Sequence, residues 1–221
     1  AFRGAREQGG WVTSWSFPGE AGRMKGNHAI SLRSEGWIKG IRTFDTERAL
    51  QAYLHEATNK GPWGPSNGRD GWKEYYQLGF VPYPQYREAT AKTLEYAYDD
   101  FCGYQLANLT GNTFYKNIFE RQMYNYKNVY DAAVGFMRGR KITGEWAPGF
   151  DPVEWGGPFT EGNSWHWVWS VFRDIRGLIH LRCDNRTFNA NLDSDFTVPN
   201  TVNLGTFGSM ITGLTAMVCA N

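Results

Sequence analysis

The fold class of this chain is decided by the stretch ATAKTLEYAYDDFCGYQLANL, residues 89–109. One side of it carries, at helical spacing, Leu94, Ala97, Tyr98, Phe101, Gln105 and Leu106. Gly111 follows closely and is the residue type that most often ends a helix. The stretch therefore predicts a long helix. Asp99 and Asp100 would point about 100° apart on it, so we expect them to tie the helix to its neighbours rather than to act as a facing carboxylate pair.

The same spacing predicts further helices over 27–41, 46–58 and 114–126, with Asp45 as the N-cap of the second. Loops rich in Gly and Pro separate them, over 59–70 and 135–158. The pattern predicts a mainly α fold of helix pairs joined by long loops. Such pairs suggest a helical toroid with its site at the loop end.

The segment after Thr160 fits two kinds of element. Trp165, Trp167 and Trp169 alternate as in a strand, whereas an i, i+4, i+7 set that continues through Leu178 and Leu181 fits a helix. The longer set favours a helix here. The sequence shows no internal repeat of fixed period and no low-complexity linker. We therefore predict one domain, or part of one, over 1–221.

Composition narrows the possible partners. The chain has 221 residues and a formal net charge of +1 without a basic block, which argues against nucleic acid and anionic membrane surfaces. No apolar run is long enough to span a bilayer. Ten Trp and twelve Tyr suit carbohydrate binding, and they suit a well-packed core equally. The first residues include neither an initiator Met nor the apolar part of a signal peptide, so we expect the chain to begin inside a longer or processed protein.

The cysteines and glycosylation motifs say little about function. Cys102, Cys183 and Cys219 are odd in number and widely spaced, which excludes a small disulfide scaffold and a metal-ligand pattern. We expect them to be small buried side chains. Asn108 and Asn185 each begin an N-glycosylation acceptor pattern, which permits a secretory history.

The main functional candidate lies in WGGPFTEGNSWHW, residues 155–167. Glu161 stands there between glycines, which let another molecule approach, and indoles, whose faces stack on sugars. An apolar wall favours a protonated carboxyl group, which is what a glycosidase needs to protonate a leaving oxygen. Alternatively, Glu161 lies in the first turn of a helix, where its negative charge complements the helix dipole. Only geometry separates the two roles.

Four further residues are candidates for binding a substrate. Arg69, in a Gly-flanked loop, could bind sugar hydroxyls or cap a neighbouring helix through its carbonyls. His28 could donate to a substrate or be a structural histidine. Trp155 and Trp165 could be platforms for a sugar ring, although we expect at least one of them to belong to the core. The remaining histidines show no ligand cluster, so a zinc site is not expected.

Several motifs resemble one known family. In chain order they are EQGGW at 7–11, GNHA at 26–29, KGIR at 39–42, GRDG at 68–71, YQLGFVPY at 76–83, KTLEYAYDD at 92–100 and FTEGNSW at 159–165. Together they resemble the catalytic domain of glycoside hydrolase family 92, the calcium-dependent exo-α-mannosidases, over nearly the whole chain. The two motifs around 92–100 and 159–165 are highly specific in combination.

The resemblance implies a fold and a chemistry. It implies part of an (α/α)6 toroid that follows an N-terminal β-sandwich, an enzyme that removes terminal α-mannose with inversion, and α-mannoside glycans as partners. It implies Glu161 as the general acid, with calcium as cofactor. It also implies a secreted, periplasmic or cell-surface location.

The departures from the family matter equally. The family's Gly-Asn-(Glu or Gln)-Pro segment, which supplies calcium ligands, and its later Asp pair, which supplies the base, would follow the region matching 217–221. We therefore expect no metal ligand within this chain, and expect the N-terminal β-sandwich and the C-terminal part of the toroid to lie outside it. Ile30 stands where members often carry an Asp. The alternative is a non-catalytic, aromatic-rich helical module derived from this fold, which binds carbohydrate or another subunit.

Overall fold

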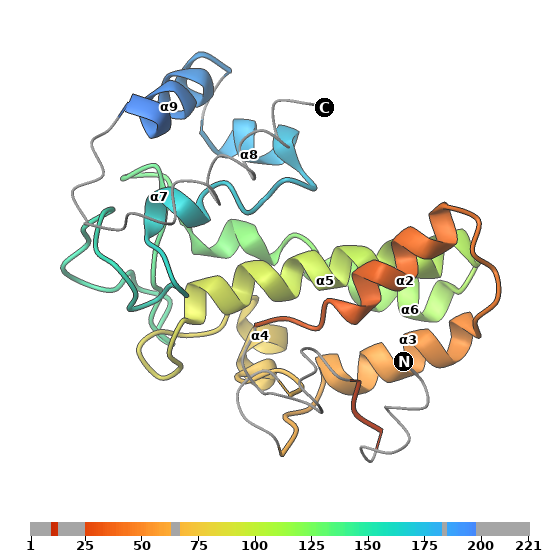
Figure 1. The fold of residues 1–221 in the computed structure, drawn as a ribbon. Coiled ribbons are helices and arrows are strands. Elements are labelled where there is room, and N and C mark those ends of the chain that lie inside the picture. The colour runs from red at the N-terminus through yellow and green to blue at the C-terminus, as the bar shows by residue number, and fades with distance from the viewer. Residues whose placement is uncertain (1–9, 13–24, 63–66, 183–184, 198–221) are drawn as a thin grey trace.

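The computed structural model describes residues 10–12, 25–62, 67–182 and 185–197. Helices dominate this part of the chain, which confirms the predicted mainly α class (Figure 1). In chain order the elements are α2 (Ala29–Ile38), α3 (Thr46–Ala57), α4 (Trp72–Leu78), α5 (Ala89–Leu109), α6 (Thr113–Gln122), the 3-10 helix η1 (Asn125–Val129), β1 (Tyr130–Asp131), β2 (Phe136–Met137), α7 (Ser164–Trp167), α8 (Ile175–Leu181) and α9 (Asn185–Thr197).

Helix α5 runs through the middle of the structure, and α2, α3 and α6 pack against it (Figure 1). Its bounds are those predicted from the spacing, and Gly111 follows it with a φ of 72°, as expected of a helix-ending glycine. Helices α5 and α3 can pack closely because Gly103 on α5 has no side chain. A Cβ at that position would lie 2.7 Å from Cε1 of Tyr53 on α3.

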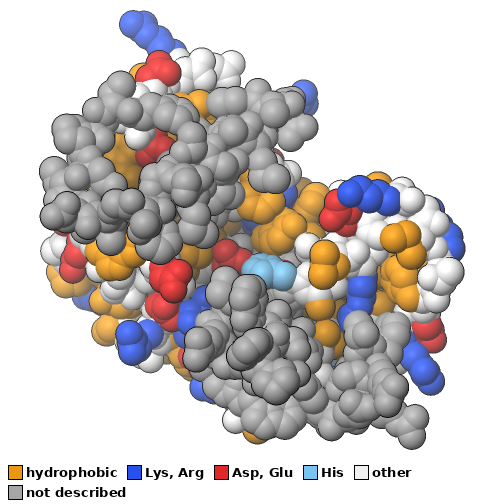
Figure 2. Space-filling view, in the orientation of Figure 1, with side chains coloured by type: hydrophobic (Ala, Val, Ile, Leu, Met, Phe, Trp, Pro, Cys, Tyr) orange, Lys and Arg blue, Asp and Glu red, His pale blue; other side chains and the backbone are white. Residues whose placement is uncertain are grey.

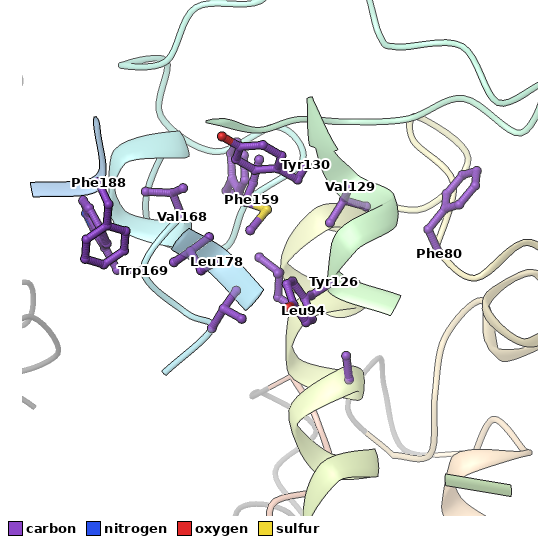
Figure 3. Packing of buried hydrophobic residues seen from close by; sticks show 13 residues of the cluster. Phe80, Leu94, Tyr126, Val129, Tyr130, Phe159, Val168, Trp169, Leu178 and Phe188 are labelled. Carbon is purple, nitrogen blue, oxygen red and sulfur yellow. The ribbon is translucent and has the colours of Figure 1, made fainter. Parts of the chain in front are cut away.

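Two of the apolar clusters contact different halves of α5. The first joins α2, α3, α5 and α6 and includes Ile30, which is 1% exposed at the position where family members often carry an Asp. The second joins α5 and η1 to the chain from β1 to α9, with Leu94 on α5 facing Leu178 on α8 (Figure 3). Phe159, from the loop before α7, also belongs to the second cluster, so this cluster fixes the base of that loop.

Local signals predicted most of the other elements. The side chain of Asp45 accepts a hydrogen bond from the Arg48 amide at 3.0 Å and caps α3, as predicted. The helix predicted over 114–126 ends at Gln122 and continues as η1. Helix α6 folds back along α5 after a short connection, which gives one of the expected helix pairs. Closure of such pairs into a toroid stays a prediction.

The continuous helix predicted after Thr160 is wrong. The chain forms the one-turn α7 and then α8, because the side chain of Asp174 accepts a hydrogen bond from the Gly177 amide at 3.0 Å and starts a second helix. Helix α4 was not predicted, since it spans only seven residues between two glycines with positive φ, Gly71 and Gly79. Helix α9 was not predicted either.

The surface charges and the burial of Cys102 agree with what the composition predicts. Acidic and basic side chains intermingle on the face shown in Figure 2, without a large patch of one sign among the described residues. None of the helices in the described ranges has the length and apolarity needed to cross a membrane. Cys102 is buried and not in a disulfide, as expected, while Cys183 and Cys219 lie outside the described residues.

Candidate active site

The loop before α7 is closed on itself by backbone hydrogen bonds. The Gly156 amide donates to the Gly162 carbonyl at 2.8 Å, and the Phe159 amide donates to the Gly156 carbonyl at 3.0 Å. Gly156 and Gly157 have φ values of 84° and 59°, which glycine adopts at little cost. The loop therefore turns tightly and presents Glu161 close to its closing hydrogen bond.

Asn163 separates this loop from α7. Its side chain accepts hydrogen bonds from the amides of Trp165 and His166, at 3.1 and 3.3 Å, while the Asn163 amide donates to Nδ1 of His166 at 3.2 Å. This capping box starts α7 at Ser164. Glu161 precedes the helix, so the role considered for it in a first helical turn is not the one it has in the structure.

Glu161 lines a recess of about 540 Å³. Trp155 and Phe159 from the same loop line it as well, and so do Tyr83 and Glu88 from the segment before α5. The side chain of Glu161 is exposed, and that of Trp155 is partly buried with its ring 5.7 Å from the ring of His166. The recess thus holds a carboxyl group beside an indole, which is the combination that a sugar-protonating site needs.

The N-terminus of α5 holds the two sides of the recess together. The amide of Glu88 donates to the Gly157 carbonyl at 3.2 Å, and the amides of Thr90 and Ala91 donate to the Pro158 carbonyl at 3.0 and 3.1 Å. These carbonyls satisfy amides that a helix N-terminus leaves without a partner inside the helix. The loop that carries Trp155 and Glu161 is thereby fixed to the central helix.

Both carboxyl-bearing residues of the recess have a strained backbone. Among the described residues other than glycine, positive φ values occur at Glu88, with 55°, and at Glu161, with 45°. A residue with a Cβ in this region costs on the order of 1–3 kcal/mol and persists where its surroundings hold it, often at functional sites. Both strained residues line the same recess.

Comparison with known proteins identifies the family of this chain. The model of the glycosyl hydrolase family 92 catalytic domain matches residues 2–218. The chain belongs to glycosyl hydrolase family 92. No curated protein matches it.

Solved structures of family 92 enzymes are similar to this chain in sequence and in fold. A family 92 inverting mannosidase from Bacteroides thetaiotaomicron shares 44% identity and a TM-score of 0.85, over 98% of this chain and 29% of that one. An α-mannosidase of the family from the same bacterium shares 34% identity and a TM-score of 0.77, over 85% of this chain and 24% of that one. A complex of it with mannoimidazole gives a TM-score of 0.77 at 33% identity, over 85% of this chain and 25% of that one. This family 92 chain spans less than a third of the length of these relatives.

Arg69 lies in the interior of the family 92 chain. Its side chain is 0% exposed, and its guanidinium donates to the carboxylate of Asp100 at 3.0 and 3.1 Å. It also donates to the Tyr53 hydroxyl at 2.6 Å and to the Tyr96 carbonyl, within α5, at 3.1 Å. Of the two roles considered for Arg69, the structural one matches these contacts. Asp100 ties α5 to its neighbours, as the sequence predicted.

His28 lies in a different recess, of about 180 Å³, which Leu94, Tyr98 and Phe172 also line. Its Nδ1 is 2.9 Å from Asp99 and its Nε2 is 2.8 Å from Glu95. The charge of Asp99, with a smaller contribution from Glu95, outweighs burial and raises the pKa of His28 to about 11. His28 thus connects the start of α2 to α5 through both carboxylates.

The two tryptophans lie in different surroundings. Trp155 lines the recess of Glu161, whereas Trp165, also partly buried, packs edge-on against Phe136 with ring centroids 4.7 Å apart and does not line that recess. The recess thus unites two of the five predicted site residues, Glu161 and Trp155. It also includes Tyr83 and Glu88, which the sequence did not single out as site residues. No spacing or pattern connects these two with Glu161, because backbone hydrogen bonds bring the segments together.

Proposed function

We propose that this chain is part of a glycoside hydrolase that removes terminal α-linked mannose with inversion, and that Glu161 is its general acid. The observation that carries the proposal is the recess in which Glu161, on a strained and tightly closed turn, stands beside Trp155. Support comes from the family 92 match over residues 2–218 and from the inverting mannosidase with 44% identity. The substrates we propose are α-mannoside glycans.

Trp155 and Glu161 have different roles in the proposed reaction. The partly buried indole of Trp155 offers a flat face to the C–H groups of a sugar ring. Glu161 then protonates the glycosidic oxygen as the bond to the leaving group breaks. Inversion also requires a carboxylate that activates water on the opposite face, roughly 6.5–9.5 Å from the acid. We place that base outside this sequence, in the Asp pair that the family resemblance implies.

Calcium is part of the proposal, but its ligands are not placed in this chain. Calcium takes about six to eight oxygen ligands, several of them carboxylates. Within the described ranges, no group of three or more His, Cys, Asp or Glu side chains could hold a metal ion. We place the calcium ligands in the Gly-Asn-(Glu or Gln)-Pro segment that the family resemblance implies, outside this sequence. We also propose a location outside the cytoplasm.

The test uses the full natural polypeptide that carries this sequence. Proton NMR during hydrolysis of an α-mannoside should show β-mannose as the first product. The variant Glu161→Gln keeps the shape of the side chain but has no proton to transfer. It should lose roughly 10²–10⁴-fold in kcat on a mannose disaccharide, and less on an aryl mannoside whose leaving group needs little protonation.

Glu154→Gln is the matched control, because Glu154 is an exposed glutamate in the loop before α7 that does not line the recess of Glu161. It should keep the activity of the parent protein. Equal losses of kcat on both substrates in Glu161→Gln would refute the general-acid role of Glu161. α-Mannose as first product would refute inversion, and binding of mannosides without hydrolysis would favour the non-catalytic module.

A further inference from the structure

We propose that Glu88 is a second substrate-contacting carboxylate of the recess, which Lys25 orients to accept hydrogen bonds from hydroxyl groups of the sugar bound beside Trp155. This inference rests on the proposed function and adds a binding residue to it. Its role is to hold the sugar, not to transfer a proton.

The first argument is position. Glu88 and Glu161 line the same recess, together with Trp155. Because the Glu88 amide donates to the Gly157 carbonyl at 3.2 Å, Glu88 is held directly against the loop that carries the other two. A sugar stacked on Trp155 and protonated by Glu161 would therefore have its hydroxyl groups within the cavity that Glu88 lines.

The second argument is the orientation of the carboxylate. Nζ of Lys25 lies 2.8 Å from Oε2 of Glu88, and the two side chains are 10% and 25% exposed. The ammonium group fixes the direction of the carboxylate. A carboxylate has about four acceptor positions, so one ammonium partner leaves capacity for two sugar hydroxyls. Hydrogen bonds to a charged acceptor are about twice as strong as neutral ones.

The third argument is that the capping of α5 does not use this side chain. Glu88 occupies the N-cap position of α5 but makes no side-chain capping hydrogen bond, and Pro158 and Gly157 cap the helix through their carbonyls. The left-handed backbone at this position would suit glycine better than glutamate. Helix formation therefore gives no reason for a glutamate here, whereas sugar binding does.

The experiment compares binding with turnover in the full natural polypeptide. Calorimetric titration with mannoimidazole gives Kd, and hydrolysis of an aryl α-mannoside gives KM and kcat. We expect Glu88→Gln to raise both Kd and KM about 10-fold, which is the loss of one charge-assisted hydrogen bond, with less than about 3-fold change in kcat. Glu161→Gln should show the opposite split, and Glu154→Gln should change neither parameter.

Glu88→Gly separates binding from folding. It removes the carboxylate and relieves the left-handed strain but also removes the partner of Lys25; because these two effects oppose each other, we expect a Tm close to that of the parent protein together with the same 10-fold loss of affinity. A parent-like Kd in either Glu88 variant would overturn the inference while leaving the proposed function intact. If the unaltered protein neither binds mannoimidazole nor hydrolyses mannosides, both the proposed function and this inference fall.

Discussion

Substitution of Asp100 by asparagine tests the buried network at the centre of the fold. Asp100 is 0% exposed and accepts four hydrogen bonds: two from Arg69 and one each from the hydroxyls of Tyr53, at 2.7 Å, and Tyr75, at 2.9 Å. Asn has one acceptor oxygen and no charge. It would leave the guanidinium of Arg69, also 0% exposed, without its counter-charge.

The structure sets the magnitude. Breaking a buried ion pair by removing one partner costs about 3–5 kcal/mol, because the remaining charge is buried without compensation. We expect Asp100→Asn to lower the free energy of unfolding by that amount in the full natural polypeptide. Urea unfolding followed by far-UV circular dichroism measures it. Glu35→Gln is the control, because Glu35 pairs with Lys39 on the surface of α2 and should cost less than about 0.5 kcal/mol.

A double-mutant cycle decides whether the uncompensated charge is the cause. Arg69→Met removes the guanidinium, so the pair Arg69→Met with Asp100→Asn should cost at least about 2 kcal/mol less than the sum of the two single variants. Additive costs, or a loss below about 1 kcal/mol in Asp100→Asn alone, would show that the ion pair does not govern the packing of α3 and α4 on α5.

Two further predictions concern His28 and the glycines. The pKa of His28, raised to about 11 from an ordinary value near 6.5, means that its stabilising contribution is complete below pH 6.5 and is lost as the pH rises toward 11. The imidazole NMR signals of His28 should therefore not titrate between pH 5 and 9, and a midpoint near 6.5 would refute this connection of α2 to α5. Gly103→Ala should lower the free energy of unfolding by about 1–3 kcal/mol, since its Cβ would lie 2.7 Å from Tyr53. Gly36→Ala on α2, where the nearest atom is 3.8 Å away, should stabilise the protein by up to about 1 kcal/mol, and equal effects of the two would contradict the packing argument.

The sequence by itself determined what depends on neighbours along the chain. The bounds of α5 followed from apolar spacing and a glycine stop, and the start of α3 followed from Asp45, because helical spacing and capping act within a few residues. The family followed from motifs in a fixed order. Glu161 and Trp155 could be proposed as partners because the same short loop carries both of them.

Only the tertiary structure decided what depends on segments far apart. The spacing after Thr160 favoured one helix, but α8 begins separately at Asp174, whose carboxylate accepts a hydrogen bond from the Tyr126 hydroxyl of η1 at 2.6 Å, and α8 packs on η1 and α5. Arg69 resembled a loop arginine for a ligand, yet it lies in the interior because Asp100, about three turns into α5, neutralises it there. Glu88 joined Glu161 because carbonyls of the loop before α7 cap α5. Every residue has the same backbone carbonyl. The pattern of side chains therefore could not predict that this loop caps α5 through its carbonyls.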